Sequence, residues 1–129
     1  MQPRIAVIYL SYKSGQYISE AISTLARISY PREGWEIIIV DNKVPGDNSA
    51  ELIKERVLPR AGVDLPEVTL LENQTNLGFA GGMNTGLREA MARDFDYVLI
   101  LNQDGEVSPT ILQELASAAE SDSKIGAAQ

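Results

Sequence analysis

Four short apolar runs, separated by stretches with a helical pattern, constrain the fold of this chain most strongly. Each run is continuous rather than alternating and is rich in Ile, Val and Leu, which is typical of strands covered on both faces. Such strands alternating with helices predict an α/β fold, with a mostly parallel, open sheet sandwiched between helices. The runs are Ile5 to Leu10, Ile37 to Val40, Val68 to Leu71 and Tyr97 to Leu101.

A helical pattern follows each apolar run, with apolar residues at three- and four-residue spacing or with residues that favour helix starts. The expected helices run from about Gly15 to Ile28, from near Asn48, from after Gly81-Gly82 toward Arg93, and from Ser108 as N-cap with Pro109 at the first helical position. The segment from Ile125 to Gln129 fits the beginning of a fifth strand. We expect one domain over residues 1–129, since no internal repeat or linker interrupts the pattern.

The residue types that are absent restrict the chemistry. The chain has no cysteine and no histidine, so disulfides, thiolate zinc sites and Ser-His or Cys-His nucleophiles are excluded. Eighteen acidic against eleven basic residues give a net charge of -7, which opposes binding to nucleic acid. No apolar stretch approaches the roughly 18 residues that suggest a membrane span. We therefore expect a cytoplasmic protein, and leave peripheral association with the inner membrane open.

Polar side chains gather where the predicted strands end. Ser11 and Tyr12 follow the first strand, Asp41 the second, and Asn102 and Asp104 the last. Ligands of open parallel sheets bind beyond the carboxyl ends of the strands, so Asp41 and Asp104 are expected to share one crevice. Asp41 could accept a hydrogen bond from a nucleobase beside Tyr12, although an Asp at this position is more often a turn former. Asn102 and Asp104 offer oxygen ligands to a hard divalent cation, with a polar turn as the alternative explanation.

The segment Asn76-Leu77-Gly78-Phe79-Ala80-Gly81-Gly82-Met83-Asn84 is the most unusual stretch of the sequence. Its glycines can expose backbone N–H groups at the start of a helix, where a phosphate or a sugar can approach closely. A tight, well-packed crossover is the alternative explanation. The segment matches neither the dinucleotide-binding G-x-G-x-x-G spacing nor the P-loop, so NAD binding and P-loop ATP hydrolysis lose support.

Taken together, the strand ending in Ser11-Tyr12, the strand ending in Asp41, the NLGFAGGMN segment and the strand ending in LNQD resemble family-two inverting glycosyltransferases. The resemblance covers nearly the whole chain and lies nearest to a bacterial, rhamnosyltransferase-like branch. It implies a GT-A fold of the nucleotide-diphospho-sugar transferase type. It also implies the site residues: Ser11, Tyr12 and Asp41 at the base of a nucleotide diphosphate sugar, Asn76, Gly78, Gly82 and Asn84 around the donor pocket, and Asn102 and Asp104 in a DxD-type metal motif.

The resemblance further implies a divalent metal cofactor, Mg²⁺ or Mn²⁺, with Asp104 as the stronger ligand. Asn102 stands where many relatives have Asp, which removes one negative charge from the motif. The donor is expected to be a UDP- or dTDP-sugar, because both bases present the imide edge that Asp41 would read. The family places its catalytic base and acceptor site in a later segment, beyond Gln129. This chain is therefore expected to be the donor-binding part of a longer enzyme, inactive by itself, whose acceptor is a saccharide or a lipid-linked molecule.

Two other functions stay open at this point. A sugar nucleotidyltransferase shares strand-end carboxylates and a glycine-rich loop, but commonly places that loop after the first strand rather than the third. A noncatalytic α/β binding module is the second alternative, because a fold does not fix a function.

Overall fold

The structure, a computed structural model, describes residues 2–129 and confirms the predicted α/β class. All four strands pair in parallel in one sheet of order β3-β2-β1-β4. The strands are β1 (Ile5–Ser11), β2 (Trp35–Asn42), β3 (Glu67–Asn73) and β4 (Tyr97–Leu101), each of which contains one of the apolar runs.

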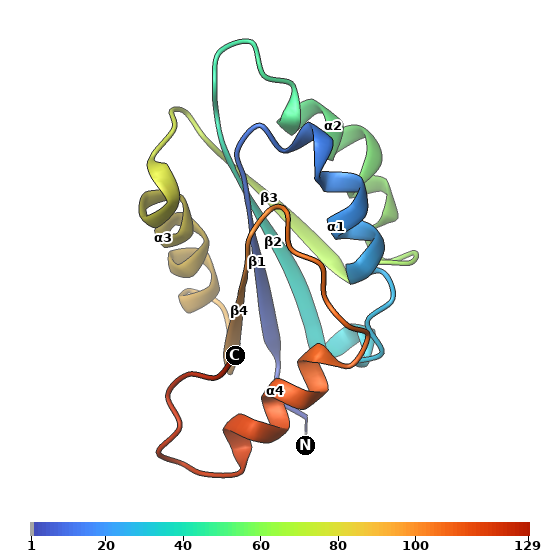
Figure 1. Cartoon of the computed structure of the whole chain (residues 1–129), viewed down its shortest axis with the longest axis vertical. Coiled ribbons are helices and arrows are strands. Elements are labelled where there is room, and N and C mark those ends of the chain that lie inside the picture. The colour runs from blue at the N-terminus through green and yellow to red at the C-terminus, as the bar shows by residue number, and fades with distance from the viewer. Residues whose placement is uncertain (1) are drawn as a thin grey trace.

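Helices cover both faces of the sheet. The α-helices are α1 (Ile18–Leu25), α2 (Ser49–Arg56), α3 (Gly78–Met91) and α4 (Ile111–Glu120), and short 3-10 helices lie at η1 (Ser14–Gln16), η2 (Arg32–Gly34) and η3 (Leu58–Arg60). In Figure 1, α3 lies on one side of the sheet, and α1, α2 and α4 lie on the other. Each helix thus buries one apolar face against the strands, as a parallel sheet requires.

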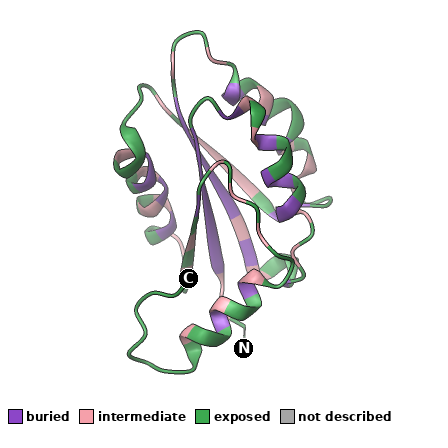
Figure 2. Cartoon of the chain, viewed as in Figure 1, coloured by how far each residue is buried: buried purple, intermediate pink, exposed green. Residues whose placement is uncertain are grey.

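Two hydrophobic cores form because successive strand residues point to opposite faces. Val7 and Ile39 belong to the core under α1, α2 and α4, whereas Ile8 and Ile38 belong to the core under α3. All four side chains are fully buried. Figure 2 shows this burial along the central strands β1 and β2. The continuous apolar runs in the sequence follow directly from this two-sided covering.

The strand order creates a switch point between β1 and β4. The chain passes from β1 through β2 to β3 in one direction across the sheet, and then returns to place β4 on the other side of β1. The connection that leaves β1 leads to α1 on one face of the sheet, whereas the connection from β3 to β4 runs through α3 on the other face, and a crevice lies beyond the carboxyl ends of β1 and β4. In open α/β sheets, this is the position at which ligands bind.

The glycine-rich segment is a helical turn rather than a loop, so the predicted start of the third helix is wrong. Helix α3 begins at Gly78, three residues before the Gly81-Gly82 pair. A methyl group on Gly82 would lie 2.5 Å from Leu10 Cδ1, and one on Gly86 would lie 2.7 Å from Ile8 Cγ2. These two glycines let the helix approach the sheet closely.

Three other local predictions also differ from the structure. The first expected helix is divided into η1 and α1, which ends at Leu25. Helix α4 starts at Ile111 with Thr110 as its N-cap residue, so Ser108 and Pro109 precede it. Ile125 to Gln129 does not form a strand. This segment lines a small apolar pocket beside β4 and α4 instead.

Candidate functional site

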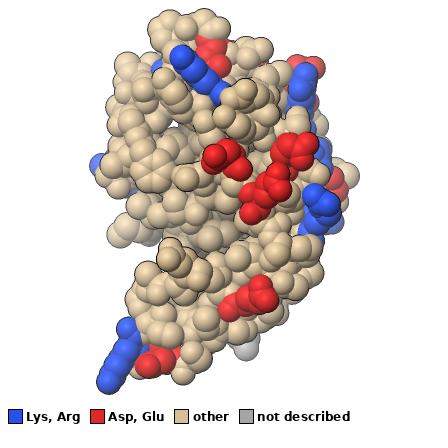
Figure 3. All heavy atoms as spheres, viewed as in Figure 1, with Lys and Arg blue, Asp and Glu red and all other residues tan. Residues whose placement is uncertain are grey.

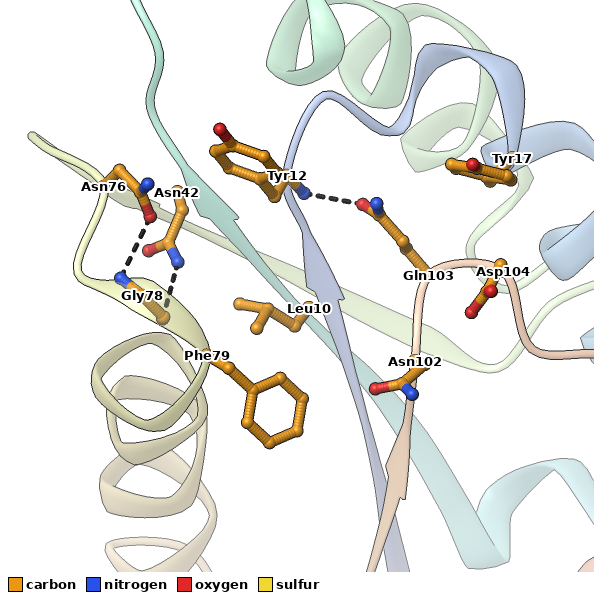
Figure 4. Close-up of a pocket in the computed structure, with 10 residues that line it drawn as sticks. All are labelled: Leu10, Tyr12, Tyr17, Asn42, Asn76, Gly78, Phe79, Asn102, Gln103 and Asp104. Carbon is orange, nitrogen blue, oxygen red and sulfur yellow. Dashed lines mark hydrogen bonds between the residues drawn. The ribbon is translucent and has the colours of Figure 1, made fainter.

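A pocket of about 380 Å³ opens at the switch point. Figure 4 shows its walls: the end of β1 and its loop, the end of β2, the start of α3 and the turn after β4. The pocket is thus built from four segments that are far apart in the sequence. It is lined by Leu10, Tyr12, Tyr17, Asn42, Asn76, Gly78, Phe79, Asn102, Gln103 and Asp104.

Strand alternation decides which side chains reach this pocket. Leu10 belongs to the core under α3, so the even-numbered positions of β1 face that helix. Asn42 follows the same rule at the end of β2, where Val40 is also in the α3 core. The part of the pocket over the sheet therefore lies on the α3 side, where its floor is the end of an apolar core, and Tyr17, which directly precedes α1, lines its opposite end (Figure 4).

A network of amides fixes the wall formed by the start of α3. Asn42 Nδ2 donates to the Gly78 carbonyl at 2.9 Å, and Asn42 Oδ1 accepts from Asn73 Nδ2 at 2.9 Å. Asn76 Oδ1 accepts the Gly78 N–H at 2.9 Å. Gly78 has a φ of 74°, in the left-handed region that favours glycine. The predicted donor residues Asn76 and Gly78 thus form a rigid edge of the pocket, next to the exposed ring of Phe79.

The opposite wall is the turn after β4, which carries Asn102 and Asp104. Both side chains are exposed and line the pocket. The Gly105 N–H donates to the Asn102 carbonyl at 2.9 Å and closes the turn. A methyl group on Gly105 would lie 2.5 Å from Leu101 Cδ1 and 2.9 Å from the Asn102 carbonyl oxygen. The tight turn therefore requires glycine at this position.

Tyr9 anchors this turn from below the pocket. Its hydroxyl donates to the Gln103 carbonyl at 2.8 Å, and its ring is fully buried. Burial raises the pKa of the Tyr9 hydroxyl, and the nearby Asp104 carboxylate raises it further. The phenol therefore stays protonated at neutral pH and remains a hydrogen-bond donor.

Asp41 and Ser11 lie together, but on the other face of the sheet. The two residues are paired in register on β2 and β1, and the Ser11 hydroxyl donates to Asp41 Oδ1 at 2.7 Å. Both side chains are buried. Burial raises the pKa of Asp41, while the Ser11 hydrogen bond lowers it and the carboxylates of Asp47, Glu72 and Glu51 raise it.

The expectation that Asp41 and Asp104 share one crevice is wrong. Asp41 lines a separate pocket of about 130 Å³ with Lys43, Asp47 and Glu72, whereas Asp104 lines the larger pocket. Two features of the fold separate them. β1 lies between β2 and β4, and Asp41 points to the face opposite that of its neighbour Asn42.

Two further residues from the glycine-rich segment do not line the larger pocket. Gly82 is buried against Leu10 and Asn42, where it sets the distance between α3 and the sheet. Asn84 is exposed on the same helix. Of the nine residues proposed from the sequence, the pocket brings together Tyr12, Asn76, Gly78, Asn102 and Asp104.

The chemistry of the Asn102 and Asp104 wall suits a hard cation that is shared with a ligand. An amide oxygen and a carboxylate on one turn are both acceptable ligands for Mg²⁺ or Mn²⁺. Among residues 2–129, however, no three His, Cys, Asp or Glu side chains are grouped so that they could hold a metal ion. A cation at this wall would take its remaining ligands from water and from phosphate oxygens.

Comparison with known sequences identifies the family of the chain that carries this site. A sequence model described as Glycosyl transferase family 2 matches residues 6–129. The chain belongs to this family. An uncharacterized glycosyltransferase of Haemophilus influenzae is 26% identical to the family 2 chain over 125 residues, which is 97% of the chain and 35% of the relative.

Solved structures share the fold of the family 2 chain, as expected for a GT-A arrangement. The mannosyltransferase PcManGT from Pyrobaculum calidifontis, in complex with GDP-Man and Mn²⁺, has a TM-score of 0.78 and 26% identity, over 98% of this chain and 34% of that protein. S. aureus TarS 1-349, in complex with UDP-GlcNAc, has a TM-score of 0.75 and 20% identity, over 98% of this chain and 37% of that protein. The family 2 chain thus spans about a third of the length of these relatives.

Sequence reasoning missed half of the residues that line the pocket of the family 2 chain. Asn42 carries a usable signal, because it follows Asp41 directly at a strand end. Gln103 carries one as well, since it lies between Asn102 and Asp104. The other three residues, Leu10, Tyr17 and Phe79, have no local pattern that separates a pocket wall from ordinary packing.

The surface adds two observations. On the face drawn in Figure 3, the Lys and Arg side chains lie scattered near the margins rather than gathered into one basic patch. Within the described part of the family 2 chain, no helix combines the length and the apolar character needed to cross a bilayer.

Proposed function

We propose that this family 2 chain binds the nucleotide diphosphate sugar donor of a glycosyltransferase, and that the whole protein transfers the sugar to an acceptor hydroxyl with inversion. The observation that carries the proposal is the pocket at the switch point. Its volume of about 380 Å³ falls in the range of small-molecule sites. It combines apolar and aromatic walls, fixed amides and a single carboxylate, which suits a sugar and a diphosphate better than a protein partner.

We place the nucleobase of the donor at the carboxyl ends of β1 and β2. Tyr12 is partly exposed at the pocket and offers a ring face for stacking. Asp41, aligned by Ser11 in the smaller pocket on the other face, would offer its carboxylate to the imide edge of a pyrimidine that extends across the ends of β1 and β2. This assignment favours UDP- or dTDP-sugars. The S. aureus TarS complex with UDP-GlcNAc is in accord with it, whereas the GDP-Man complex of the Pyrobaculum mannosyltransferase makes a guanine nucleotide the necessary comparison.

The diphosphate is placed between the start of α3 and the turn after β4. Gly82 supports this wall from α3 by close packing on the sheet, and Asn84, exposed on the same helix outside the pocket lining, would contact the donor from there. Asp104, assisted by Asn102, would hold a Mg²⁺ or Mn²⁺ ion. When bound, such an ion neutralises the charge of the departing diphosphate. The Mn²⁺ complex of the Pyrobaculum mannosyltransferase supports this cofactor.

The remaining parts of the reaction are assigned to the longer protein. An inverting transfer needs a carboxylate base that deprotonates the acceptor hydroxyl. We place this base and the acceptor site beyond Gln129, so the 129-residue chain binds the donor without efficient turnover. The acceptor we propose is a saccharide or a lipid-linked molecule, as in cell-surface polysaccharide synthesis by a rhamnosyltransferase-like enzyme. Its place would be the cytoplasm, with peripheral contact to the inner membrane.

Calorimetric titration tests donor binding without requiring turnover. The chain is titrated with UDP, dTDP and GDP, each with Mn²⁺ and with a chelator. We expect saturable binding of a pyrimidine diphosphate that is weakened about tenfold or more by chelation, because the cation offsets repulsion between the diphosphate and an acidic protein. Asp104→Asn is expected to remove the metal effect, and Asp41→Asn to weaken binding with and without metal.

The control is Asp94→Asn, which removes the same charge at an exposed position away from both pockets. It should leave every titration unchanged. If the chain bound GDP more tightly than UDP and dTDP, only the assignment of a pyrimidine base would be contradicted. Absence of binding by the folded chain to all three nucleotides would contradict the donor-binding proposal and favour a noncatalytic module.

A further inference from the structure

Gln103 connects the two walls of the pocket. Its side-chain Oε1 accepts the backbone N–H of Tyr12 at 2.8 Å, across the gap between the β1 loop and the turn after β4 (Figure 4). Its own carbonyl accepts the hydroxyl of Tyr9 at 2.8 Å. Both hydrogen bonds of Gln103 are therefore made to β1 or to the loop after it, while its neighbours Asn102 and Asp104 face the pocket.

The loop that Gln103 holds is strained. Lys13, which follows Tyr12, has φ 48° and ψ 47°, and it is the only residue other than glycine with a positive φ in the part of the chain that the structure describes. A long side chain rarely adopts this left-handed conformation without support from its surroundings. The loop has two supports beside Lys13: the Tyr12 N–H to Gln103, and the Ser14 N–H to Ser49 Oγ at 2.8 Å.

The turn that carries Gln103 is well anchored, and it can therefore act as the support. Tyr9 is fully buried and remains protonated, so its hydroxyl donates to the Gln103 carbonyl throughout the neutral pH range. The Gly105 N–H closes the same turn. A shift of this turn would move the Gln103 side chain, and with it the Tyr12 backbone.

We infer that Gln103 is a positioning residue that couples the cation wall to the base side of the site. This inference rests on the proposed function, in which Asp104 and Asn102 hold the cation and Tyr12 contacts the base. Binding of the cation would shift the turn after β4 as a unit, and Gln103 would transmit the shift to Tyr12. The cation should therefore raise the affinity for the base even when no phosphate is present to contact it.

Two substitutions at Gln103 distinguish the effect of its hydrogen bond from the effect of its size. Gln103→Met keeps the length of the side chain but removes the acceptor, and the Tyr12 N–H can then bond to water because the contact is exposed. Gln103→Glu keeps the acceptor and serves as the conservative variant. If Gln103 had a purely structural role, Gln103→Met would lower the stability of the chain without changing the effect of the metal on the affinity for the base.

The probe is uridine, which carries no phosphate, so any effect of the metal on its binding must pass through the protein. With Mg²⁺, the affinity of the wild-type chain for uridine is expected to rise about fivefold or more, the lower end of typical couplings between sites. Gln103→Met should reduce this factor to near one, and Gln103→Glu should retain it. Nuclear magnetic resonance should show the Tyr12 amide signal moving on addition of Mg²⁺ alone in the wild type and in Gln103→Glu, and staying fixed in Gln103→Met.

The coupling is overturned if Gln103→Met responds to Mg²⁺ as the wild type does, or if the Tyr12 signal of the wild type does not move. UDP is titrated in parallel to separate the two proposals. Binding of UDP together with either of these results overturns the role of Gln103 and leaves donor binding in place. Absence of UDP binding overturns the proposed function itself.

Discussion

Asp41 combines burial with a proposed binding role. Its raised pKa, caused mainly by burial, means that the folded state holds the proton more tightly than the unfolded chain does. Stability from this group is therefore full below the ordinary pKa of 3.8 and is lost as the pH rises through the raised value. Asp41→Asn should remove this loss while keeping an acceptor for the Ser11 hydroxyl. We expect the variant to be more stable than the wild type at pH 7 and equal to it near pH 3, by urea unfolding at both values.

Asp94→Asn is the control for this comparison, since it changes the net charge equally at an exposed site. It should not reproduce the gain at pH 7. The same Asp41→Asn protein should bind UDP more weakly, because an amide reads the imide edge less well than a carboxylate. A variant that is less stable at pH 7 would show that the charged form of Asp41 is stabilised by contacts that outweigh its burial.

In helix α3, replacing either of two glycines by alanine is expected to lower stability, but only one replacement should also affect ligand binding. Gly86→Ala places a methyl group against the stiff side chains of Ile8 and Val40, whereas Gly82→Ala places one against Leu10 and the Asn42 amide. Overpacking costs about 1–3 kcal/mol, and a helical Ala instead of Gly returns up to about 1 kcal/mol. Each variant should thus lose about 1 kcal/mol of unfolding free energy, as measured by denaturant titration.

Only Gly82→Ala should also weaken UDP binding, because Asn42 holds the Gly78 carbonyl at the pocket edge. The pair therefore distinguishes packing from shaping of the site within one helix. Equal affinities of both variants for UDP would show that the position of Asn42 does not matter for binding.

At the end of the sheet opposite the pocket, one carboxylate joins segments that are far apart in the chain. Glu36, at the start of β2, pairs with Arg4 at 3.0 Å and with Arg93, and the two guanidinium groups lie against the ring of Phe95. The Glu36 side chain is largely buried, and its carboxylate is the salt-bridge partner of both arginines. Glu36→Gln should lower the unfolding free energy by about 1–2 kcal/mol, by thermal or denaturant unfolding.

Asp64→Asn, which breaks the exposed pair with Arg60, is the matched control and should leave stability nearly unchanged. UDP affinity should be unchanged in Glu36→Gln, since Glu36 lies at the far end of the strands. A loss of UDP binding without a loss of stability would indicate that the two ends of the sheet are coupled.

Local patterns in the sequence were enough to predict the four strands, their parallel arrangement between helices, and the polar residues at their ends. These follow from local causes: two-sided burial produces continuous apolar runs such as Ile37 to Val40, and a strand end exposes polar side chains. The strand order, by contrast, became known only from the folded chain: it puts β4 beside β1 and separates Asp41 and Asp104 into different pockets. Only the folded chain also showed that Gly82 packs on the sheet and that Gln103 reaches Tyr12. The physical reason is that these contacts join segments far apart in the chain, and local patterns of hydrophobicity carry no information about which distant segments meet.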